Sequence, residues 1–280
     1  MNVLQEQAEK AEQLRKLHYG PKILVLPNAW DVVSARILEE AGFPAIATTS
    51  AGIAHSLGYP DGERISRKEM LEVVGRIASA VKVPVTADLE AGYGKTPEEM
   101  AVTARELIAA GGVGLNLEDI TGEDESSHVE LSLQVKKIQA IREAGEKLGV
   151  PLVINARTDI YLLPIGEEST RFDRTVERLR AYRKAGADCV FAPGLKDGAT
   201  IGKLVQAVEA PLNILLLPGC PSITEMEKLG VARVSTGSGL MRAGLGHVRR
   251  VAQALRDARD ASALYGGAIP FAEINRMLMS

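Results

Sequence analysis

A unit that repeats eight times along the chain most restricts how this sequence can fold. Each unit opens with a short apolar run, and most runs are followed by an amphipathic helical stretch. Four of these stretches end in related letters, EAGFPAI, AAGGVGL, KAGADCV and KLGVARV. A glycine after the last helical turn, followed directly by a strand, is typical of a βα repeat. The sequence therefore predicts an α/β protein with a parallel sheet.

The number of units distinguishes a barrel from an open sheet. Eight units within about 250 residues predict a (β/α)8 TIM-type barrel. A doubly wound sheet typically has a glycine-rich turn after its first strand, whereas the first turn here reads LPNAWD. The expected strands are residues 23–27, 45–49, 83–88, 113–118, 152–157, 188–192, 212–216 and 232–236. The expected helices are residues 31–41, 67–81, 96–110, 131–148, 169–185, 196–207 and 223–229.

The two ends of the chain extend beyond these units. The first 20 residues are charged throughout and predict a helix that faces solvent. Residues from about 249 to 280 exceed what one closing helix needs, and their apolar end reads IPFAEINRMLM. We expect this end to be a lid on the barrel or a helical arm onto a neighbouring copy. No linker divides the chain, so residues 1–280 are predicted to form one domain.

Composition excludes several classes of partner. The net charge of -3 comes with no large block of Lys and Arg, so we expect no nucleic-acid partner. No run approaches the ~18 apolar residues of a membrane span. The two cysteines, Cys189 and Cys220, have no metal-ligand or disulfide spacing, which suits a reducing compartment. The sequence predicts a cytoplasmic protein without a membrane partner.

Acidic side chains collect where the predicted strands end. In VTADLEAGYG, Asp88 and Glu90 share one face by alternation, and Glu118 ends the next predicted strand. Active sites of such barrels lie at the carboxyl ends of the strands. Two carboxylates about 5 Å apart repel by ~3 kcal/mol at an effective dielectric constant near ~20, so three of them need a cation or a shared proton. An oxygen-only set favours Mg²⁺, or Mn²⁺, as the cofactor.

Other strand ends suggest substrate contacts and leave an alternative open. Arg157 ends the fifth predicted strand, and Asn213 lies in the seventh. After the second strand, Ser50, Ala51 and Gly52 could hold an anion with their backbone N–H groups. The segment STGSGLMR after the eighth strand lies where many barrels bind phosphate, so a phosphosugar-binding barrel is an alternative. No predicted strand contains a lysine, which argues against Schiff-base chemistry.

Five motifs occur in the order that one enzyme family shows. They are NAWDVVSA, TTSAGIAHSLGYPDGE, TADLEAGYG, NLED and INARTD, and with them the chain resembles the isocitrate lyase/phosphoenolpyruvate mutase family from about residue 24 to 240. The resemblance implies that residues 50–52 hold a substrate carboxylate and that Arg157 contacts the oxo-acid oxygens. It also implies that Mg²⁺ is surrounded by Asp61, Asp88, Glu90 and Glu118. Family members commonly form dimers of dimers that exchange the last barrel helix.

The chain departs from the lyases of this family at two places. Their Lys-Lys-Cys-Gly-His loop is replaced by EDITGEDESSHVELS, where Thr121 is the only polar residue near the position that phosphonate enzymes use. Their glutamate after the sixth strand is replaced by Ala192 and Pro193. The sequence leaves the proton donor open among Tyr93, Lys95 and His128.

These observations lead to one preferred function and two alternatives. We expect a Mg²⁺-dependent lyase that cleaves or decarboxylates a small, oxaloacetate-like 2-oxo or 2-hydroxy acid through a metal-stabilised enolate. In this prediction Arg157, Glu118 and Asp61 are catalytic, and Ser50, Ala51, Gly52, Asp88, Arg157 and Asn213 bind the carboxylate substrate. Asp88, Glu90 and Glu118 bind the metal. The alternatives are a phosphonate mutase or hydrolase and a non-catalytic 2-oxo-acid-binding protein. A homodimer or homotetramer with a swapped C-terminal helix is expected.

Overall fold

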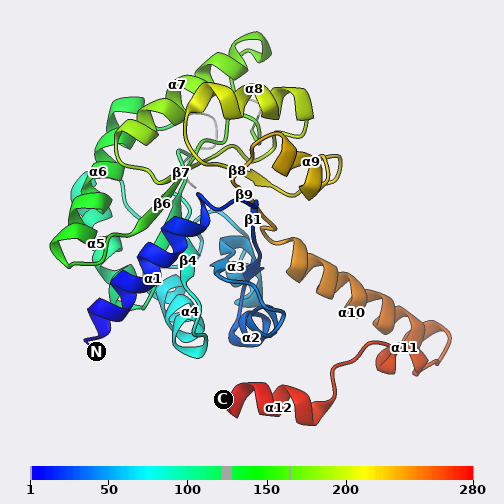
Figure 1. Ribbon diagram of the computed structural model, residues 1–280. Coiled ribbons are helices and arrows are strands. Elements are labelled where there is room, and N and C mark those ends of the chain that lie inside the picture. The colour runs from blue at the N-terminus through cyan, green and yellow to red at the C-terminus, as the bar shows by residue number, and fades with distance from the viewer. Residues whose placement is uncertain (1, 121–127, 164, 280) are drawn as a thin grey trace.

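Parallel strands form the sheet that the repeated units predict (Figure 1). The fold is described from a computed structural model for residues 2–120, 128–163 and 165–279. In this part of the chain every neighbouring pair of strands is parallel. The strands are β1 (Leu24–Leu26), β2 (Asn28–Ala29), β3 (Ile46–Thr48), β4 (Val85–Asp88), β5 (Gly114–Leu117), β6 (Val153–Arg157), β7 (Cys189–Phe191), β8 (Leu212–Leu215) and β9 (Arg233–Ser235).

The first predicted strand is divided in two, and this division closes the sheet. β1 pairs with β9, and β2 pairs with β3, so the two ends of the sheet meet on either side of Pro27. Proline has no N–H to give to a ladder. Its carbonyl still accepts a hydrogen bond from the Ala47 amide at 2.9 Å. The predicted (β/α)8 barrel is therefore confirmed, with its first strand interrupted at Pro27.

Helices follow the strands and cover the outside of the barrel (Figure 1). Several start where the sequence supplies a capping box, at Asp31, Ser66, Thr96 and Ser222. The helices are α1 (Val3–Leu17), α2 (Val32–Glu40), α3 (Ser50–Ser56), α4 (Arg67–Ala80), α5 (Pro97–Ala109), α6 (Leu131–Lys147), α7 (Arg171–Lys184), α8 (Gly198–Val208), α9 (Ile223–Lys228), α10 (Gly239–Asp257), α11 (Ser262–Tyr265) and α12 (Phe271–Met279). A 3-10 turn, η1 (Glu168–Thr170), precedes α7.

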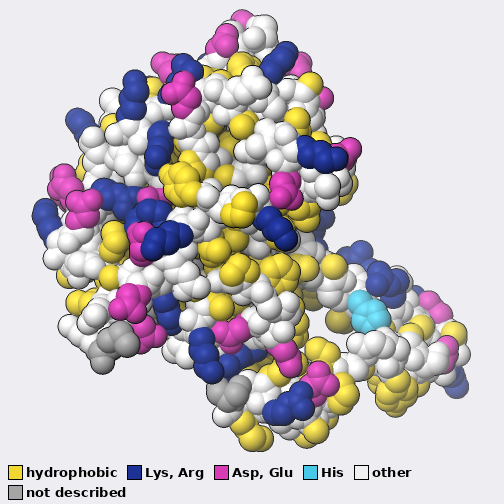
Figure 2. All heavy atoms as spheres, viewed as in Figure 1, with side chains coloured by type: hydrophobic (Ala, Val, Ile, Leu, Met, Phe, Trp, Pro, Cys, Tyr) yellow, Lys and Arg dark blue, Asp and Glu magenta, His cyan; other side chains and the backbone are white. Residues whose placement is uncertain are grey.

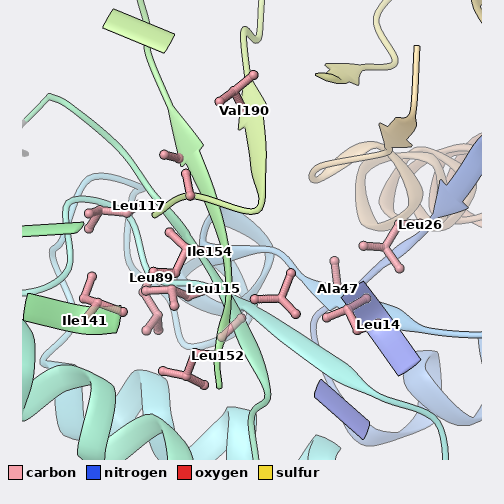
Figure 3. Packing of buried hydrophobic residues seen from close by; sticks show 14 of the residues in the cluster. Leu14, Leu26, Ala47, Leu89, Leu115, Leu117, Ile141, Leu152, Ile154 and Val190 are labelled. Carbon is pink, nitrogen blue, oxygen red and sulfur yellow. The ribbon is translucent and has the colours of Figure 1, made fainter. Parts of the chain in front are cut away.

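The apolar core fills the layer between the sheet and its helices. Leu115 and Leu117 of β5 lie in the same cluster as Ile141 of α6, and all three are fully buried (Figure 3). Because side chains alternate along a strand, Asn116 points the opposite way, into the barrel. The same alternation carries Asp88 and Arg157 inward at the ends of β4 and β6. Strand register therefore brings the polar strand-end residues to one mouth.

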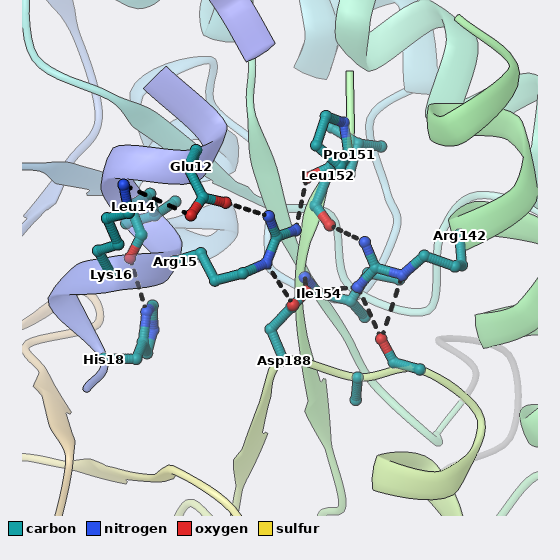
Figure 4. Close-up of polar contacts among 12 residues, drawn as sticks. Glu12, Leu14, Arg15, Lys16, His18, Arg142, Pro151, Leu152, Ile154 and Asp188 are labelled. Carbon is teal, nitrogen blue, oxygen red and sulfur yellow. Dashed lines mark hydrogen bonds and ion pairs between the residues drawn. The ribbon is translucent and has the colours of Figure 1, made fainter. Parts of the chain in front are cut away.

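Helix α1 packs on the barrel instead of facing solvent, so that expectation was wrong. Its Ala11 and Leu14 are fully buried. Arg15 donates its Nε–H to Asp188 Oδ1 at 2.8 Å, and Arg142 of α6 donates to the other oxygen of the same carboxylate (Figure 4). Two guanidinium groups that share one buried carboxylate attach α1 to the barrel wall. The charges of the first 20 residues conceal this short apolar face.

The C-terminal arm, residues 239–279, leaves the barrel body along α10 (Figure 1). Further along the arm, α12 returns to contact α2. Several apolar side chains of the arm are open to solvent, among them Val248 at 60% and Phe271 at 83% exposure (Figure 2). The exchange of this arm between copies stays a prediction. Among the residues described, no helix has the length and apolar character that a membrane crossing requires.

Candidate active site

Two adjoining cavities open at the carboxyl ends of the strands. The larger has a volume of about 550 Å³ and the smaller about 160 Å³. Asp61, Arg157 and Leu162 line both of them. The larger cavity also contains Ser50, Ala51, Asp88 and Asn116, and the smaller one contains Glu90, Glu118 and Asp159. Most of the predicted site residues therefore meet at one place.

Asp88 is held firmly at the floor of the larger cavity. Its Oδ2 accepts hydrogen bonds from the Ser50 amide at 3.2 Å and the Ser50 hydroxyl at 2.9 Å. Its Oδ1 accepts from Asn116 Nδ2 at 3.2 Å, and its own amide donates to Thr48 Oγ1 at 3.0 Å. Asn155 Nδ2 in turn donates to Asn116 Oδ1 at 2.7 Å. The carboxylate is thus oriented by the start of α3 and by Asn116 of β5, which Asn155 of β6 orients in turn.

Arg157 occupies the junction of the two cavities between two acids. Its Nε–H donates to Asp159 Oδ1 at 2.8 Å, and its Nη1 is paired with Glu118. The guanidinium lies 5.6 Å from the centre of the Phe191 ring. Burial lowers the pKa of Arg157, but Asp159 and Glu118 outweigh that effect and raise it above its ordinary value. The side chain is a fixed cation at the meeting point of the cavities.

Burial raises the pKa of the acids around this cation. The pKa of Glu118 lies well above its usual range because its carboxyl is desolvated, although Arg157 opposes the shift. Burial and nearby Asp61 raise the pKa of Glu90 to about 7. Asp61 is exposed as a residue, yet burial of its carboxyl and the charge of Asp88 raise its pKa as well. Burial therefore disfavours the charged forms of these acids, and neighbouring acids add to the effect.

A strained turn places Glu90. The residue has a φ of 52°, in the left-handed region that non-glycine residues rarely adopt. Its carboxylate accepts from the Glu63 amide and, at 3.0 Å, from the Tyr93 hydroxyl. Glu63 in turn accepts from the Tyr93 amide at 2.8 Å. Tyr93 therefore holds the Glu90 carboxylate in place by a hydrogen bond. This contact explains the position of Tyr93 in the motif better than direct contact with substrate does.

The predicted anion cradle is the first turn of a helix, not a loop. Ser50 and Ala51 begin α3 and line the larger cavity. The N-terminus of a helix favours negative charge. Gly52 lines neither cavity, because its amide donates to Thr49 Oγ1 and a Cβ there would lie 2.9 Å from Cβ of Trp30. Gly52 packs closely against Trp30, and its contact with substrate stays a prediction.

Other candidates from the sequence lie away from the cavities. Asn213 is fully buried in the barrel, lies near Ser235 at 3.4 Å and lines neither cavity. Leu215, two residues further along β8, does line the larger one, so Asn213 is one layer too deep. His128 and Lys95 are also absent from both linings. Thr121 falls outside the described residues.

The cavities contain residues that the sequence analysis did not select. Arg242, on the first turn of α10, lines the larger cavity. It belongs to STGSGLMR, a segment that the sequence indicated only as a phosphate site. Asp159 stands two residues after Arg157, where strand alternation could have indicated it. Leu162 and Phe191 add apolar walls that only the folded chain reveals.

The acids do not form a closed metal cage. Within residues 2–120, 128–163 and 165–279, no three Asp, Glu, His or Cys side chains converge closely enough to ligate one ion. Direct ligation by Asp88, Glu90 and Glu118 together therefore does not match this geometry. Mg²⁺ commonly binds through one or two carboxylates and keeps several waters. The oxygen-only donor set, with three acids whose pKa is raised, fits such a water-mediated site.

Fold and site together define a class of protein, a (β/α)8-barrel enzyme with an acid-lined mouth around one arginine. The chain belongs to the isocitrate lyase/phosphoenolpyruvate mutase family, because the family model described as phosphoenolpyruvate phosphomutase matches residues 14–256. Members of this family are carbon–carbon lyases and mutases, and the chain is an enzyme of that family.

Three proteins illustrate what this chain is similar to. A solved structure from Burkholderia cenocepacia J2315, provisionally assigned as a lyase/mutase, is 40% identical with a TM-score of 0.91 and covers 99% of this chain and 98% of its own. Oxaloacetate decarboxylase of Bradyrhizobium diazoefficiens is 30% identical over 93% of this chain and 87% of its own length. Oxaloacetate acetylhydrolase, solved with its product oxalate, is 26% identical with a TM-score of 0.85, over 96% of this chain and 93% of its own.

Proposed function

We propose that this enzyme is a Mg²⁺-dependent lyase that breaks a carbon–carbon bond in a small 2-oxo dicarboxylic acid of the oxaloacetate type. The observation that carries the proposal is Arg157, a partly buried cation fixed between Glu118 and Asp159 and next to the oriented carboxylate of Asp88. Two relatives whose names refer to oxaloacetate support the substrate class.

Asp61, Asp88, Glu90 and Glu118 would hold Mg²⁺, in part through water. The raised pKa values of Asp61, Glu90 and Glu118 are what a nearby divalent cation would lower. When bound, Mg²⁺ supplies a Lewis acid that polarises the carbonyl of a 2-oxo acid. Mn²⁺ offers the same oxygen-binding chemistry and could replace it.

Residues of the chain would bind the substrate and stabilise the charge that develops on it. The start of α3 would bind the C1 carboxylate with the backbone N–H of Ala51, since the Ser50 amide donates to Asp88. Arg157 would donate hydrogen bonds to the 2-oxo oxygen, on which negative charge develops as the carbon–carbon bond breaks. In decarboxylation the C3–C4 bond breaks, carbon dioxide leaves and the electron pair forms the enolate of pyruvate. A proton then returns to C3.

The rim of the larger cavity fits a substrate with a second carboxylate. Arg242 lines this rim from α10 and would pair with the carboxylate remote from the 2-oxo group. Phe191, Leu162 and Leu215 supply an apolar wall beside it. Exclusion of water by such a wall strengthens the electrostatic contacts of Arg157 with the reacting oxygen.

The test is product analysis by ¹³C NMR. Labelled oxaloacetate and unlabelled phosphonopyruvate and methylisocitrate are each incubated with enzyme and Mg²⁺ or with enzyme and chelator. Metal-dependent formation of pyruvate from oxaloacetate supports decarboxylation, and formation of oxalate with acetate supports hydrolytic cleavage. Turnover of phosphonopyruvate alone would replace the proposal with the phosphonate alternative. No turnover of oxaloacetate above the rate without enzyme would refute it.

We also propose that the enzyme assembles by exchange of α10 between two copies. An apolar groove of about 1080 Å³ lies between α1 and β1, and its lining includes Ile23, Val25 and Phe43. In a (β/α)8 barrel the helix after the last strand packs on the outer wall beside the first strand. Here α10 points away from its own barrel while its Leu245 and Val248 are 52% and 60% exposed. A second copy of α10 has the length and apolar face to fill the groove.

Native mass spectrometry of the full chain and of Val248→Asp tests this assembly. The wild type should be a dimer or tetramer, and the buried charge should shift the variant toward monomer. The exposed Arg256→Gln on the same helix is the control and should keep the assembly. A monomeric wild type at micromolar concentration would contradict the proposal.

A further inference from the structure

A second cluster of polar side chains lies behind Arg157 and reaches the smaller cavity at Asp159. Its centre is Asp119, which follows Glu118 directly and is completely buried. Asp119 Oδ2 accepts from Arg178 Nε at 2.7 Å and from the Tyr182 hydroxyl at 2.7 Å. Asp119 Oδ1 accepts from the backbone amide of Asp159 at 3.1 Å. We name Asp119, Asp159, Arg178 and Tyr182 the Asp119 cluster.

The cluster connects helix α7 to the ends of two strands. Arg178 and Tyr182 are one turn apart on α7, and Arg178 Nε also lies 2.8 Å from the Tyr182 hydroxyl. Arg178 Nη2 donates to the Val129 carbonyl at 2.6 Å, while the Val129 amide donates to the Asp119 carbonyl at 2.8 Å. The Arg178 guanidinium thereby connects α7 to Asp119 and to Val129.

This arrangement fixes the positions of both acids that contact Arg157. One partner, Glu118, is the chain neighbour of Asp119. The other, Asp159, has its backbone amide bound to Asp119 and its side chain bound to Arg157 Nε. A shift of the Asp119 carboxylate would therefore displace the two acids between which Arg157 is held. A direct structural connection runs from α7 to the cation of the site.

We infer that Arg178 and Tyr182 are positioning residues, which fix the direction of Arg157 through Asp119 and Asp159. The inference deepens the proposed function, because it rests on Arg157 as the group that meets the substrate. Neither residue lines a cavity, so neither touches the substrate. Outer partners that orient the residues of a binding site commonly change affinity or activity by about 10-fold to 100-fold when they are removed.

The inference applies without any metal or substrate, and this allows an independent test. Hydrogen exchange followed by mass spectrometry reports on a peptide that covers residues 158–163. The Asp159 amide should exchange about 10-fold faster in Arg178→Met than in the wild type, because its acceptor Asp119 is no longer held. Tyr182→Phe removes one hydroxyl only and should give a smaller change in the same direction.

Titration with Mg²⁺ and oxalate by calorimetry gives the functional readout. Oxalate is a planar dianion that reproduces the carboxylate and adjacent oxygen of a 2-oxo acid. Its Kd should rise about 10-fold in Arg178→Met. Arg178→Lys keeps a charged donor for Asp119 and should recover most of the affinity. Arg180→Met is the matched control, because Arg180 lies on the same helix, donates to the Ala207 carbonyl and should leave affinity unchanged.

The outcomes separate this inference from the proposed function. If the wild type binds no oxalate with Mg²⁺, the proposed function fails, while the exchange rate at Asp159 still decides the role of Arg178. If Arg178→Met lowers only the melting temperature and leaves both Asp159 exchange and oxalate Kd at wild-type values, Arg178 is structural alone. In that case the inference is wrong.

Discussion

Replacement of Arg157 by methionine is the most informative perturbation of this site. Methionine keeps most of the side-chain volume and its contact with Phe191 but removes every donor. The lost contacts are a hydrogen bond to Asp159 at 2.8 Å and the pair with Glu118. Loss of one donor aimed at a developing negative charge lowers kcat by about 10²-fold to 10³-fold, or about 3 to 4 kcal/mol. We expect kcat/KM for oxaloacetate to fall by that factor.

The same substitution has a stability effect whose sign can be worked out. Removing one partner of a buried ion pair costs about 3 to 5 kcal/mol when the other stays charged. Here burial already raises the pKa of Glu118 and of Asp159, so both acids can take up protons once the cation is gone. A folded-state pKa above the unfolded value stabilises the protein at low pH and loses that effect as pH rises. The variant should therefore become more stable as pH falls through the raised pKa values of these two acids.

The assay combines steady-state kinetics with urea denaturation at several pH values, for wild type, Arg157→Met and the surface control Arg180→Met. A kcat/KM within about threefold of the wild type would refute the assignment of Arg157. A variant whose stability is independent of pH would refute the assumption that Glu118 and Asp159 depend on Arg157 for their charge.

Further predictions concern the acids of the mouth and the base of the barrel. Glu118→Gln should lower Mg²⁺-dependent turnover by about 10²-fold, measured with saturating metal, whereas a phosphate-binding barrel would keep its ligand affinity. Because the pKa of Glu90 is raised to about 7, the metal-free protein should lose melting temperature as pH rises through that value; Glu90→Gln should reduce this loss, as scanning calorimetry with chelator can show. Asp188→Asn should lower the free energy of unfolding in urea by about 3 kcal/mol, since Arg15 and Arg142 lose their shared counter-ion.

The barrel could be predicted from the sequence because its signal is repetition. Each βα unit repeats the same hydrophobic pattern and glycine punctuation, so errors in single elements do not change the fold class. Short elements could not be predicted in this way, because they are too short to show a periodic pattern. Helix α3 has seven residues, too few for a 3.6-residue period to appear. Helix α1 was expected to face solvent because its buried face is small, with Ala11 and Leu14 among many charges.

Alternation along the strands was enough to predict which strand-end residues of the site face into the barrel. Alternation gives the face of a residue but not its depth along the barrel axis, because neighbouring strands are staggered. Asp88 and Arg157 were therefore identified, while Asn213 faces inward but lies below the cavity. The position of Arg242 at the larger cavity could not be predicted. It depends on the direction in which α10 leaves β9, and no local sequence pattern encodes that direction.

Charge balance explains why these residues belong together. Among the residues that the structure describes, the smaller cavity is lined by the acids Asp61, Glu90, Glu118 and Asp159 and by one cation, Arg157. The fold reduces their repulsion through hydrogen bonds, as Tyr93 and the Glu63 amide do for Glu90. These contacts do not restore the ordinary pKa of Glu90, Asp61 or Glu118. A site that served stability alone would replace such acids with apolar side chains, since buried charge is costly. In the proposed function, a bound divalent cation would favour the charged forms of these acids.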